Sequence, residues 1–495
     1  MNESNILDKI IKQRKNDLKK KGPSLGFSIP NNRTRPIVPF LVPSGTILEV
    51  KRASPSKGDI AIDLDAVKLA KTYAKAGTQA ISVLTESHFF KGSLQDLKEV
   101  SAAVPECSIL RKDFLLEEAE IEVSYLCGAD AVLLIARILK TDQLLRMAAK
   151  ARSFSMTPFI EVRDMDDLAK LEEAIQEGEV VAGVNSRDLA TFQIDSLIPA
   201  AMRNLLPCKA VFESGVKTIE DAVFAKSIGY EGVLIGENAA KNPALTPSLV
   251  KAFNQAKPNK IGDFWKTLAM RRETKKEKHP GIPLVKICGI TNLEDAVRAA
   301  ELGADLIGFV FTESPRQASI SLVQEVRKTL LSMELYPLLV GVITDPLSSF
   351  GIKAITKAEH GVLDAIQFHD CRFPSVLDFV SLSYGRYGAI RLSNPSHLDE
   401  AKRLVSHGEP RVLVDARVEG LLGGTGVSIP ENLVLEAKKM APLWLAGGIS
   451  PSNVKEFVSK YQPELIDVSS FLESSPGKKS IEKMNLFFKE LHNER

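Results

Sequence analysis

Short apolar segments alternate with amphipathic segments along most of the chain, and this alternation limits the possible folds more than any other feature. The apolar segments recur about every 20–35 residues, and a strand followed by a helix, repeated many times, predicts a parallel sheet. The first eight are Thr46–Val50, Ala80–Leu84, Ile109–Phe114, Ala131–Ala136, Pro158–Val162, Val180–Val184, Ala210–Glu213 and Glu231–Ile235. Eight more are Leu284–Cys288, Leu306–Phe311, Leu338–Ile343, Ala365–His369, Ala389–Ser393, Arg411–Ala416, Leu443–Ala446 and Leu465–Ser469.

Two sets of eight strand–helix units favour closed barrels over open sheets, which usually have five to seven strands. A solenoid could have a similar period, but these units share no consensus, and their loops differ in length and chemistry. We therefore predict an α/β fold of two tandem (β/α)8 TIM barrels. Apolar residues at helical spacing within residues 4–21 predict an extra N-terminal helix on the first barrel.

The alternation stops between the two sets. Residues 257–282 contain a basic run and two prolines, which is typical of a solvated connection. We expect a charged linker, with at most a short helix around Phe264–Met270. The predicted domains are residues 1–256, the linker 257–282, and residues 283–495.

Composition narrows the class of protein. A hydrophobic fraction of 44%, a charged fraction of 25% and a net charge of +2 are typical of a globular domain and indicate neither a nucleic-acid nor a membrane partner. The first residues lack the apolar core of a signal peptide. The cysteines show no metal-binding or disulfide spacing, so we expect no metal and a cytoplasmic location. They are Cys107, Cys127, Cys208, Cys288 and Cys371.

Charged and amide side chains gather at the ends of the predicted strands of the first barrel. A single Glu or Lys there is more often part of a structural ion pair. Several together indicate an active site, since such sites lie at the carboxyl ends of barrel strands. These residues are Glu49, Lys51, Lys112, Glu161, Asn185, Arg187 and Glu213, and Gly215 and Gly236 follow strands seven and eight, where phosphate sites are common.

The motifs ILEVKRASPSKG, ILRKDF, GVNSRDL, ESGV and GVLIGE resemble the indole-3-glycerol-phosphate synthase family, over about residues 4–256. The resemblance implies closure of the indole ring of 1-(2-carboxyphenylamino)-1-deoxyribulose 5-phosphate, with loss of carbon dioxide and water and without a cofactor. Lys112 is then the general acid, although Lys51 could share that role beside its contact with the anthranilate carboxylate. The other implied roles are proton transfer by Glu49 and Glu161, orientation by Asn185 and Glu213, and substrate binding by Ser54, Arg187, Ser214, Gly215 and Gly236.

The second barrel begins with a strand that places Lys286 and Cys288 on one side. A lone cysteine after an apolar strand is more often inert, but further polar residues end the other strands. They are Arg316 after strand two, Gln367 and His369 on strand four, Asp415 on strand six before a glycine loop at residues 423–426, and Gly447, Gly448, Ser469 and Ser470 after strands seven and eight.

The motifs KICGIT, SPR, VLVDA, GGTG, LAGGISPSNV and IDVSSxxExxPGKK resemble the phosphoribosylanthranilate isomerase family, over about residues 283–495. The resemblance implies an Amadori rearrangement with the Cys288 thiolate as general base and Asp415 as general acid. Arg316 would bind the anthranilate carboxylate, Gln367 and His369 would contribute to substrate binding, and Gly447, Gly448, Ser469 and Ser470 would bind phosphate. A purely structural histidine at position 369 is an equally good interpretation.

The two resemblances imply consecutive steps of tryptophan biosynthesis on one chain. The substrates would be small anthranilate phosphosugars, and the chain could act as a monomer. Two alternatives stay open. One is another phosphosugar barrel enzyme, such as a tryptophan synthase α-type lyase or a histidine-pathway isomerase, although these lack the paired lysines and the Cys288/Asp415 pair. The other is a pair of phosphosugar-binding barrels in which one or both activities are lost.

Overall fold

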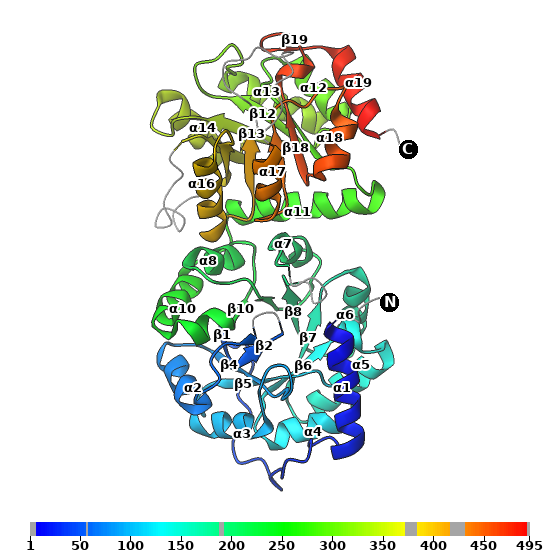
Figure 1. Cartoon of the computed structure of the whole chain (residues 1–495), viewed down its shortest axis with the longest axis vertical. Helices are drawn as coiled ribbons and strands as arrows, with labels where there is room; N and C mark the ends of the chain where they lie inside the picture. Colours follow the sequence, from blue (N-terminus) through cyan, green and yellow to red (C-terminus); the bar gives the residue numbers. More distant parts are fainter. Residues whose placement is uncertain (1–5, 56–57, 188–192, 372–383, 416–430, 493–495) are drawn as a thin grey trace. The chain divides into compact units, whose positions relative to one another are not determined.

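A computed structural model describes residues 6–55, 58–187, 193–371, 384–415 and 431–492. The chain divides into two compact units, Met1–Lys257 and Pro258–Arg495, and each contains a closed barrel of eight parallel strands surrounded by helices (Figure 1). The predicted fold class is confirmed. The glycine loop expected at residues 423–426 lies outside the described residues.

The first barrel closes through β1, which pairs with both β4 and β10. Its strands are β1 (Gly45–Val50), β4 (Ala80–Leu84), β5 (Ser108–Lys112), β6 (Ala131–Ile135), β7 (Thr157–Val162), β8 (Val181–Asn185), β9 (Ala210–Glu213) and β10 (Gly232–Ile235). The helices are α1 (Ile6–Lys21), α2 (Ala66–Lys75), α3 (Leu94–Ala103), α4 (Ala119–Leu126), α5 (Thr141–Ser153), α6 (Met165–Gln176), α7 (Leu197–Arg203), α8 (Ile219–Ser227), α9 (Glu237–Lys241) and α10 (Thr246–Gln255). A two-stranded hairpin, β2 (Ala53–Ser54) with β3 (Gly58–Asp59), follows β1.

Apolar side chains fill the interior of this barrel below the strand ends. Ile47, Leu110, Phe159 and Val211 alternate along their strands with outward-facing residues and form one cluster with Phe40, whose ring lies 5.6 Å from that of Phe159. The interior is therefore packed with side chains, as in other barrels of this size. Charged residues can point inward only at the carboxyl ends of the strands, where the packing stops.

The second barrel is built in the same way. Its strands are β11 (Leu284–Cys288), β12 (Leu306–Val310), β13 (Leu338–Ile343), β14 (Ala365–His369), β15 (Gly385–Arg391), β16 (Val412–Asp415), β17 (Trp444–Ala446) and β18 (Leu465–Val468). Its helices are α11 (Lys260–Lys278), α12 (Leu293–Glu301), α13 (Ile320–Ser332), α14 (Ser349–Glu359), α16 (Pro395–Ser406), α17 (Glu431–Lys438), α18 (Val454–Tyr461) and α19 (Ile481–His492). The hairpin of β19 (Glu473–Ser475) and β20 (Lys478–Lys479) precedes α19.

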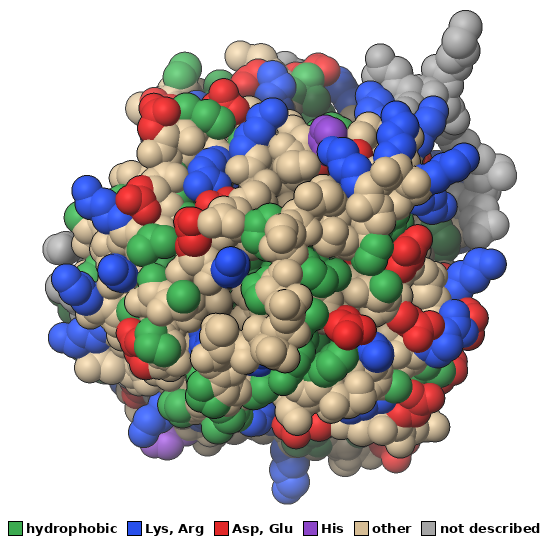
Figure 2. Space-filling model, turned by 90° about the horizontal axis from the view of Figure 1, so that it is seen from below, with side chains coloured by type: hydrophobic (Ala, Val, Ile, Leu, Met, Phe, Trp, Pro, Cys, Tyr) green, Lys and Arg blue, Asp and Glu red, His purple; other side chains and the backbone are tan. Residues whose placement is uncertain are grey.

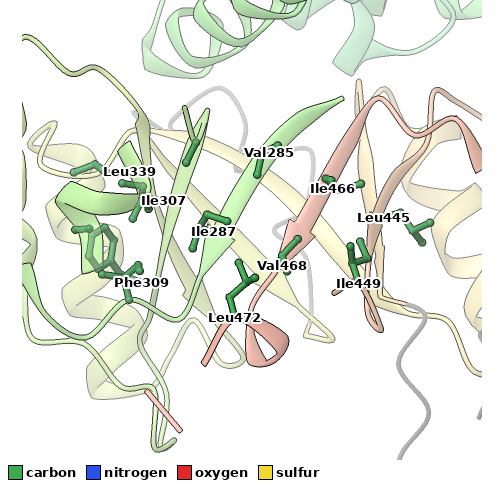
Figure 3. Close-up of a cluster of buried hydrophobic side chains, with 14 of the residues drawn as sticks. Val285, Ile287, Ile307, Phe309, Leu339, Leu445, Ile449, Ile466, Val468 and Leu472 are labelled. Carbon is green, nitrogen blue, oxygen red and sulfur yellow. The ribbon is translucent and has the colours of Figure 1, made fainter. Parts of the chain in front are cut away.

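Alternation along β11 explains how this strand serves both the core and the site. Val285 and Ile287 point out of the barrel into a large apolar cluster with residues of neighbouring strands (Figure 3). Lys286 and Cys288 therefore point into the barrel, because successive side chains of a strand face opposite sides. The outward residues anchor the strand among the helices, and the inward residues are presented to the interior.

The structure corrects the expectation of a charged linker at residues 257–282. Most of this segment is the 19-residue helix α11, which belongs to the second unit. Phe264 stacks on Tyr387 of β15, with 6.2 Å between ring centroids, and Trp265 lies 5.8 Å from the ring of Trp444 in β17. The basic run occupies the last turns of α11, where positive charges interact favourably with the helix dipole.

Two further properties concern the surface. Within the described residues no helix is long and apolar enough to cross a membrane. The face of the chain in Figure 2 shows Lys and Arg side chains interspersed with Asp and Glu. That distribution agrees with the small net charge of the sequence.

Candidate active sites

A cavity of about 260 Å³ opens at the carboxyl ends of the first barrel's strands. Its lining includes the apolar residues Leu133 and Phe114 of the barrel and Leu7 and Ile10 of α1. Its lining also includes most of the sequence-predicted residues. The predicted residues that line the cavity are Glu49, Lys51, Ser54, Lys112, Glu161, Asn185, Arg187, Ser214, Gly215 and Gly236.

Lys112 is held by carboxylates from two other strands. Its Nζ lies 2.6 Å from Glu213 Oε2 and 3.6 Å from Glu49 Oε2. Burial disfavours the ammonium, but the Glu213, Glu49 and Glu161 carboxylates outweigh that effect and raise the pKa of Lys112 above its ordinary value. Lys112 therefore carries a proton at neutral pH and can donate it to a group in the cavity.

Glu49 and Lys51 form a contact on the inner side of the end of β1. Lys51 Nζ lies 2.6 Å from Glu49 Oε1, as their spacing of two residues predicted. Burial opposes the charge of Glu49, yet Lys51 and Lys112 together lower its pKa below the ordinary value. A Cβ atom on Gly236 would lie 2.5 Å from Glu49 Oε1 and 3.0 Å from Lys51 Nζ. The glycine at this position leaves room for the ion pair.

Glu161 is the residue of this site that differs most from an ordinary carboxyl group. Burial, and then the adjacent Glu213 carboxylate, raise the pKa of Glu161 to about 8. Asn185 Nδ2 donates to Glu161 Oε2 over 3.4 Å. Burial also raises the pKa of Glu213, although Lys112 opposes this. Glu161 is thus protonated at neutral pH while Glu49 is charged, so the site contains both an acid and a carboxylate base.

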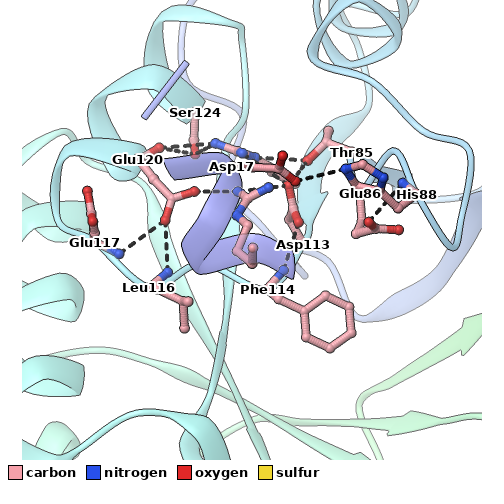
Figure 4. A network of polar contacts seen from close by, with 12 residues as sticks. Asp17, Thr85, Glu86, His88, Asp113, Phe114, Leu116, Glu117, Glu120 and Ser124 are labelled. Atoms are coloured by element: carbon pink, nitrogen blue, oxygen red, sulfur yellow. Dashed lines mark hydrogen bonds and ion pairs between the residues drawn. The ribbon is translucent and has the colours of Figure 1, made fainter. Parts of the chain in front are cut away.

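A buried polar network supports the loop that follows Lys112 (Figure 4). Asp113 lies 3.2 Å from Arg14 of α1 and 3.1 Å from Arg111, and its Oδ1 accepts the backbone N–H of Phe114. Arg14 also contacts Glu120 of α4. The network joins α1 to the end of β5, so the helix whose apolar residues line the cavity is fixed to the strand that carries Lys112.

In the second barrel, Lys286 and Cys288 lie side by side inside the strand ends. Lys286 is fully buried, and its Nζ lies 2.6 Å from Asp467 Oδ2 of β18. A Cβ atom on Gly308 of β12 would meet Cys288 Sγ at 2.7 Å and Lys286 Cε at 3.1 Å, so both side chains lie over this glycine. Burial raises the pKa of the Cys288 thiol, and the Lys286 ammonium opposes that rise.

Arg316 contacts Glu473, a residue to which the sequence analysis assigned no role. Its guanidinium donates to both carboxylate oxygens of Glu473 in β19, over 2.8 and 2.7 Å. Lys479 of β20 lies 3.1 Å from Glu473 Oε1 and donates to the Cys288 carbonyl oxygen over 2.7 Å. Burial opposes the charge of Glu473, but Arg316 and Lys479 lower its pKa. The β19–β20 hairpin therefore ties Arg316 to the neighbourhood of Cys288.

Gln367, His369 and Asp415 lie in one row. Gln367 is 2% exposed, and its Oε1 accepts from Lys286 Nζ over 2.7 Å and from the Tyr387 hydroxyl over 2.9 Å. Its Nε2 lies 3.1 Å from His369 Nδ1. His369 Nε2 in turn lies 3.7 Å from Asp415 Oδ2. The row connects the end of β14 with the end of β16.

Three glycines at the predicted phosphate positions have backbone that favours glycine. Gly215, Gly447 and Gly448 have φ angles of +82°, +93° and +70°, a region that residues with a side chain rarely adopt. Ser469 follows β18, and Ser470 begins a short 3₁₀ helix. A Cβ on Gly289 would meet Arg316 Cδ at 2.9 Å and Ser469 Oγ at 3.1 Å. Arg316 and Ser469 thus both approach the residue after Cys288.

Sequence reasoning did not select five residues that the second site contains. Lys286 and Asp467 lie on the side of their strands that faces the site. The alternation of side chains along a strand could therefore have identified them. Tyr387 ends no strand. Glu473 and Lys479 lie in the motif IDVSSxxExxPGKK, but the resemblance assigned no role to either residue. All five residues contact predicted site residues: Lys286, Tyr387, Asp467, Glu473 and Lys479.

Comparisons with known proteins agree with this division into two sites. The family model described as "Indole-3-glycerol phosphate synthase" matches residues 7–250, and "N-(5'phosphoribosyl)anthranilate (PRA) isomerase" matches residues 285–490. A multifunctional tryptophan biosynthesis protein of Schizosaccharomyces pombe is 32% identical over 98% of this chain. The chain spans 66% of that relative's length, slightly less than two thirds.

Single-function relatives match each half. Indole-3-glycerol phosphate synthase of Aliarcobacter butzleri is 35% identical, covering 50% of this chain and 98% of the relative. The crystal structure of phosphoribosylanthranilate isomerase from Thermotoga maritima has 30% identity and a TM-score of 0.36, covering 42% of this chain and 98% of that chain. The chain therefore belongs to the indole-3-glycerol phosphate synthase family through its first barrel, and its second barrel matches the N-(5'-phosphoribosyl)anthranilate isomerase family model over residues 285–490.

Proposed function

We propose that this chain catalyses two consecutive steps of tryptophan biosynthesis. The second barrel converts N-(5'-phosphoribosyl)anthranilate to 1-(2-carboxyphenylamino)-1-deoxyribulose 5-phosphate. The first barrel converts that product to indole-3-glycerol phosphate, with loss of carbon dioxide and water. The observation that carries the proposal is Lys112, held 2.6 Å from Glu213 and 3.6 Å from Glu49 in a cavity lined by both apolar and polar side chains.

The cavity of the first barrel suits an aromatic phosphosugar. Its apolar lining residues, including Phe114 and Leu133, can contact the anthranilate ring, and the Lys51 ammonium can pair with the ring's carboxylate. Ser54, Ser214, Gly215 and Gly236 lie along the same cavity and would bind the ribulose phosphate end. Arg187 adds a further positive charge for the substrate's anionic groups.

Ring closure needs a proton at the substrate's carbonyl oxygen as the aryl carbon attacks the carbonyl carbon. Lys112 donates that proton, and Glu213 positions its ammonium. The C–C bond to the carboxyl carbon then breaks, carbon dioxide leaves, and its electron pair restores the ring. Dehydration follows, in which neutral Glu161 protonates the departing hydroxyl and Glu49 accepts the proton released from the adjacent carbon of the new ring, as the C=C bond forms. Asn185 orients Glu161 for this step.

The second barrel carries the Amadori rearrangement. Asp415 gives a proton to the ribose ring oxygen as the C1–O bond breaks, leaving a C1=N iminium. The Cys288 thiolate then removes the proton from C2, and the resulting enol converts to the ketone. Arg316 binds the anthranilate carboxylate, with Glu473 holding its guanidinium in place. Gly447, Gly448, Ser469 and Ser470 bind the phosphate through backbone N–H groups.

We also propose that the chain acts as a cytoplasmic monomer. Every side chain assigned above comes from one chain, so neither site needs a second copy. The free cysteines of the described residues, including the partly exposed Cys208, Cys288 and Cys371, suit a reducing compartment. Light scattering of the purified chain and fractionation of the source cells test these two points.

One assay tests the activities together. Purified chain is given N-(5'-phosphoribosyl)anthranilate, and the three compounds of the sequence are separated and quantified over time. We expect indole-3-glycerol phosphate to accumulate after transient formation of the carboxyphenylamino sugar. Cys288→Ala should leave the starting compound unchanged, while supplied carboxyphenylamino sugar is still converted. Binding of both sugars without any product would contradict the proposal and favour barrels that have lost their activity.

A further inference from the structure

A row of hydrogen-bonding groups links the proposed base and the proposed acid of the second barrel. Its members are Lys286 beside Cys288, then Gln367, then His369 beside Asp415. Tyr387 contacts Gln367 from the neighbouring strand. The directions of the hydrogen bonds from Lys286 to Gln367 and from Gln367 to His369 can be deduced, and they assign a role to Gln367.

The orientation of the Gln367 amide is determined by Lys286. An ammonium group has three donors and no acceptor, so the Gln367 atom 2.7 Å from Lys286 Nζ must be the oxygen. The Tyr387 hydroxyl donates to the same oxygen over 2.9 Å. The amide nitrogen therefore faces His369 Nδ1 over 3.1 Å, and the two alternative orientations of the amide are not equivalent here.

That orientation selects one tautomer of His369. The Gln367 Nε2 can only donate, so His369 Nδ1 must accept, and the neutral imidazole carries its hydrogen on Nε2. Nε2 faces two carboxylates, at 3.7 Å from Asp415 Oδ2 and 3.7 Å from Asp370 Oδ2. Asp370 is also bound by Arg391, through its backbone N–H over 2.6 Å and its Nε over 3.3 Å.

We propose that Gln367 is a positioning residue that locks His369 in the Nε2–H tautomer, so that His369 donates toward Asp415 as Asp415 loses its proton. The proposal rests on the isomerase function proposed above. A donor aimed at the carboxylate that forms during proton transfer stabilises the transition state more than the ground state. Gln367 itself is buried with both ends of its amide engaged, which favours this role over direct substrate binding.

The same buried ammonium serves both proposed proton-transfer groups. Lys286 orients Gln367 and thereby His369, and it lies beside Cys288 over Gly308. Two other charged groups lie nearby. Asp467 forms an ion pair with the Lys286 ammonium at 2.6 Å, and Lys479 contacts the Cys288 carbonyl. The acid and the base are thus held by one anchored row rather than by separate supports.

Nitrogen NMR on the full chain, labelled with ¹⁵N in the histidine rings, tests the tautomer directly. The His369 signals are identified by their loss in His369→Asn, and the spectra are taken at alkaline pH. We expect a protonated Nε2 and an unprotonated Nδ1. In Gln367→Glu a carboxylate oxygen replaces the donor, so the hydrogen should move to Nδ1. We expect kcat of the isomerase to fall about 10²-fold, with KM for phosphoribosylanthranilate within threefold.

Asp370→Asn is the matched control, because it changes the other carboxylate near Nε2 and leaves Gln367 in place. Its tautomer should stay Nε2–H and its kcat within threefold. The chain's two tryptophans, Trp265 and Trp444, both pack in this unit, so their fluorescence checks that each variant is folded. If Gln367→Glu does not fold, Gln367→Met, which removes the donor without adding a charge, takes its place and should give a mixture of tautomers with reduced kcat.

Two results would overturn the proposal. One is a wild-type His369 with its hydrogen on Nδ1. The other is a folded Gln367→Glu chain with a switched tautomer and undiminished kcat. Failure of the proposed function looks different, because a wild-type chain that shows the Nε2–H tautomer but does not isomerise phosphoribosylanthranilate supports the lock and rejects the activity.

Discussion

Lys112 Nζ lies 2.6 Å from Glu213 Oε2, and these residues come from opposite sides of the first barrel, on β5 and β9. Lys112→Ala removes the proposed general acid and leaves the Glu213 carboxylate buried without its cation. We expect indole-3-glycerol phosphate formation to fall about 10²–10⁴-fold. The carboxyphenylamino sugar should accumulate, since the second barrel is unchanged. Chromatography of the reaction mixture measures both compounds.

Lys51→Ala is the comparison that separates the two lysines. If Lys51 mainly binds the anthranilate carboxylate, this substitution should raise KM for the carboxyphenylamino sugar more than it lowers kcat. An unchanged rate of indole-3-glycerol phosphate formation in Lys112→Ala would contradict the role of Lys112. A larger loss of kcat in Lys51→Ala would transfer the first protonation to Lys51.

Glu161 should make the first barrel less stable as the pH rises. Its pKa is raised from 4.5 to about 8 in the folded chain, so between those values the folded state binds a proton that the unfolded state has released. Stability then falls as pH increases through this window. Glu161→Gln keeps the neutral shape and removes the titration. The free energy of unfolding of Glu161→Gln minus that of wild type is compared at the two pH values. This difference should be more positive at pH 8.5 than at pH 5, by on the order of 2–4 kcal/mol.

Urea unfolding at the two pH values measures this difference. Glu177→Gln, at an exposed site at the end of α6, is a control that should show no comparable pH dependence. Equal shifts for Glu161→Gln at both pH values would mean that Glu161 is ionised across the whole window, and the neutral-acid role in dehydration would then fail.

Arg316 and Glu473 form a pair whose two members should respond differently to substitution. Arg316→Lys loses the two-point contact that a guanidinium makes with a carboxylate. We expect KM for phosphoribosylanthranilate to rise about 10-fold or more, because a hydrogen bond to a charged group contributes about 1.5–3 kcal/mol. Glu473→Gln keeps the guanidinium but weakens its two-point contact, so it should lower the stability of the second unit and raise KM less than Arg316→Lys does. Steady-state kinetics and urea unfolding distinguish these results, and a higher KM only in Glu473→Gln would contradict substrate binding by Arg316.

Alternation along strands was sufficient to predict much of both sites. Glu49 with Lys51 and Lys286 with Cys288 share a side because their spacing is two, and the barrel brings their strand ends to one mouth. The pair of Arg316 with Glu473 could not be predicted in this way. These residues are 157 positions apart, and their contact depends on how the β19–β20 hairpin folds back over the barrel.

Helix α11 was misread because its charge pattern concealed its apolar face. Phe264, Trp265, Leu268 and Arg272 are buried at helical spacing, but the basic run at the C-terminal end suggested a solvated linker. Arg272 is itself buried and lies 2.9 Å from Glu464, which also accepts from Arg411 and from Trp444 Nε1. A buried basic residue paired inside the protein therefore looks, in sequence, like part of an exposed charged segment.

The second barrel should depend on α11 for its stability. Trp265 is 1% exposed and packs against Trp444, so Trp265→Ala should destabilise this unit by about 3–5 kcal/mol, the usual range for removing a buried aromatic residue. Lys276→Ala, on the exposed side of the same helix, should change stability by less than about 0.5 kcal/mol. Urea unfolding, with isomerase activity as the probe of the folded second unit, measures the stability of both variants.

Fragments that begin on either side of α11 extend the same test. A fragment of residues 258–495 keeps the helix and should remain folded and active as an isomerase. A fragment of residues 283–495 exposes the rings of Tyr387 and Trp444 that Phe264 and Trp265 cover, and exposed apolar surface of this kind favours aggregation. We expect it to be poorly soluble or to unfold at a markedly lower urea concentration. Equal stability of the two fragments would show that α11 is a dispensable connection, as its composition first indicated.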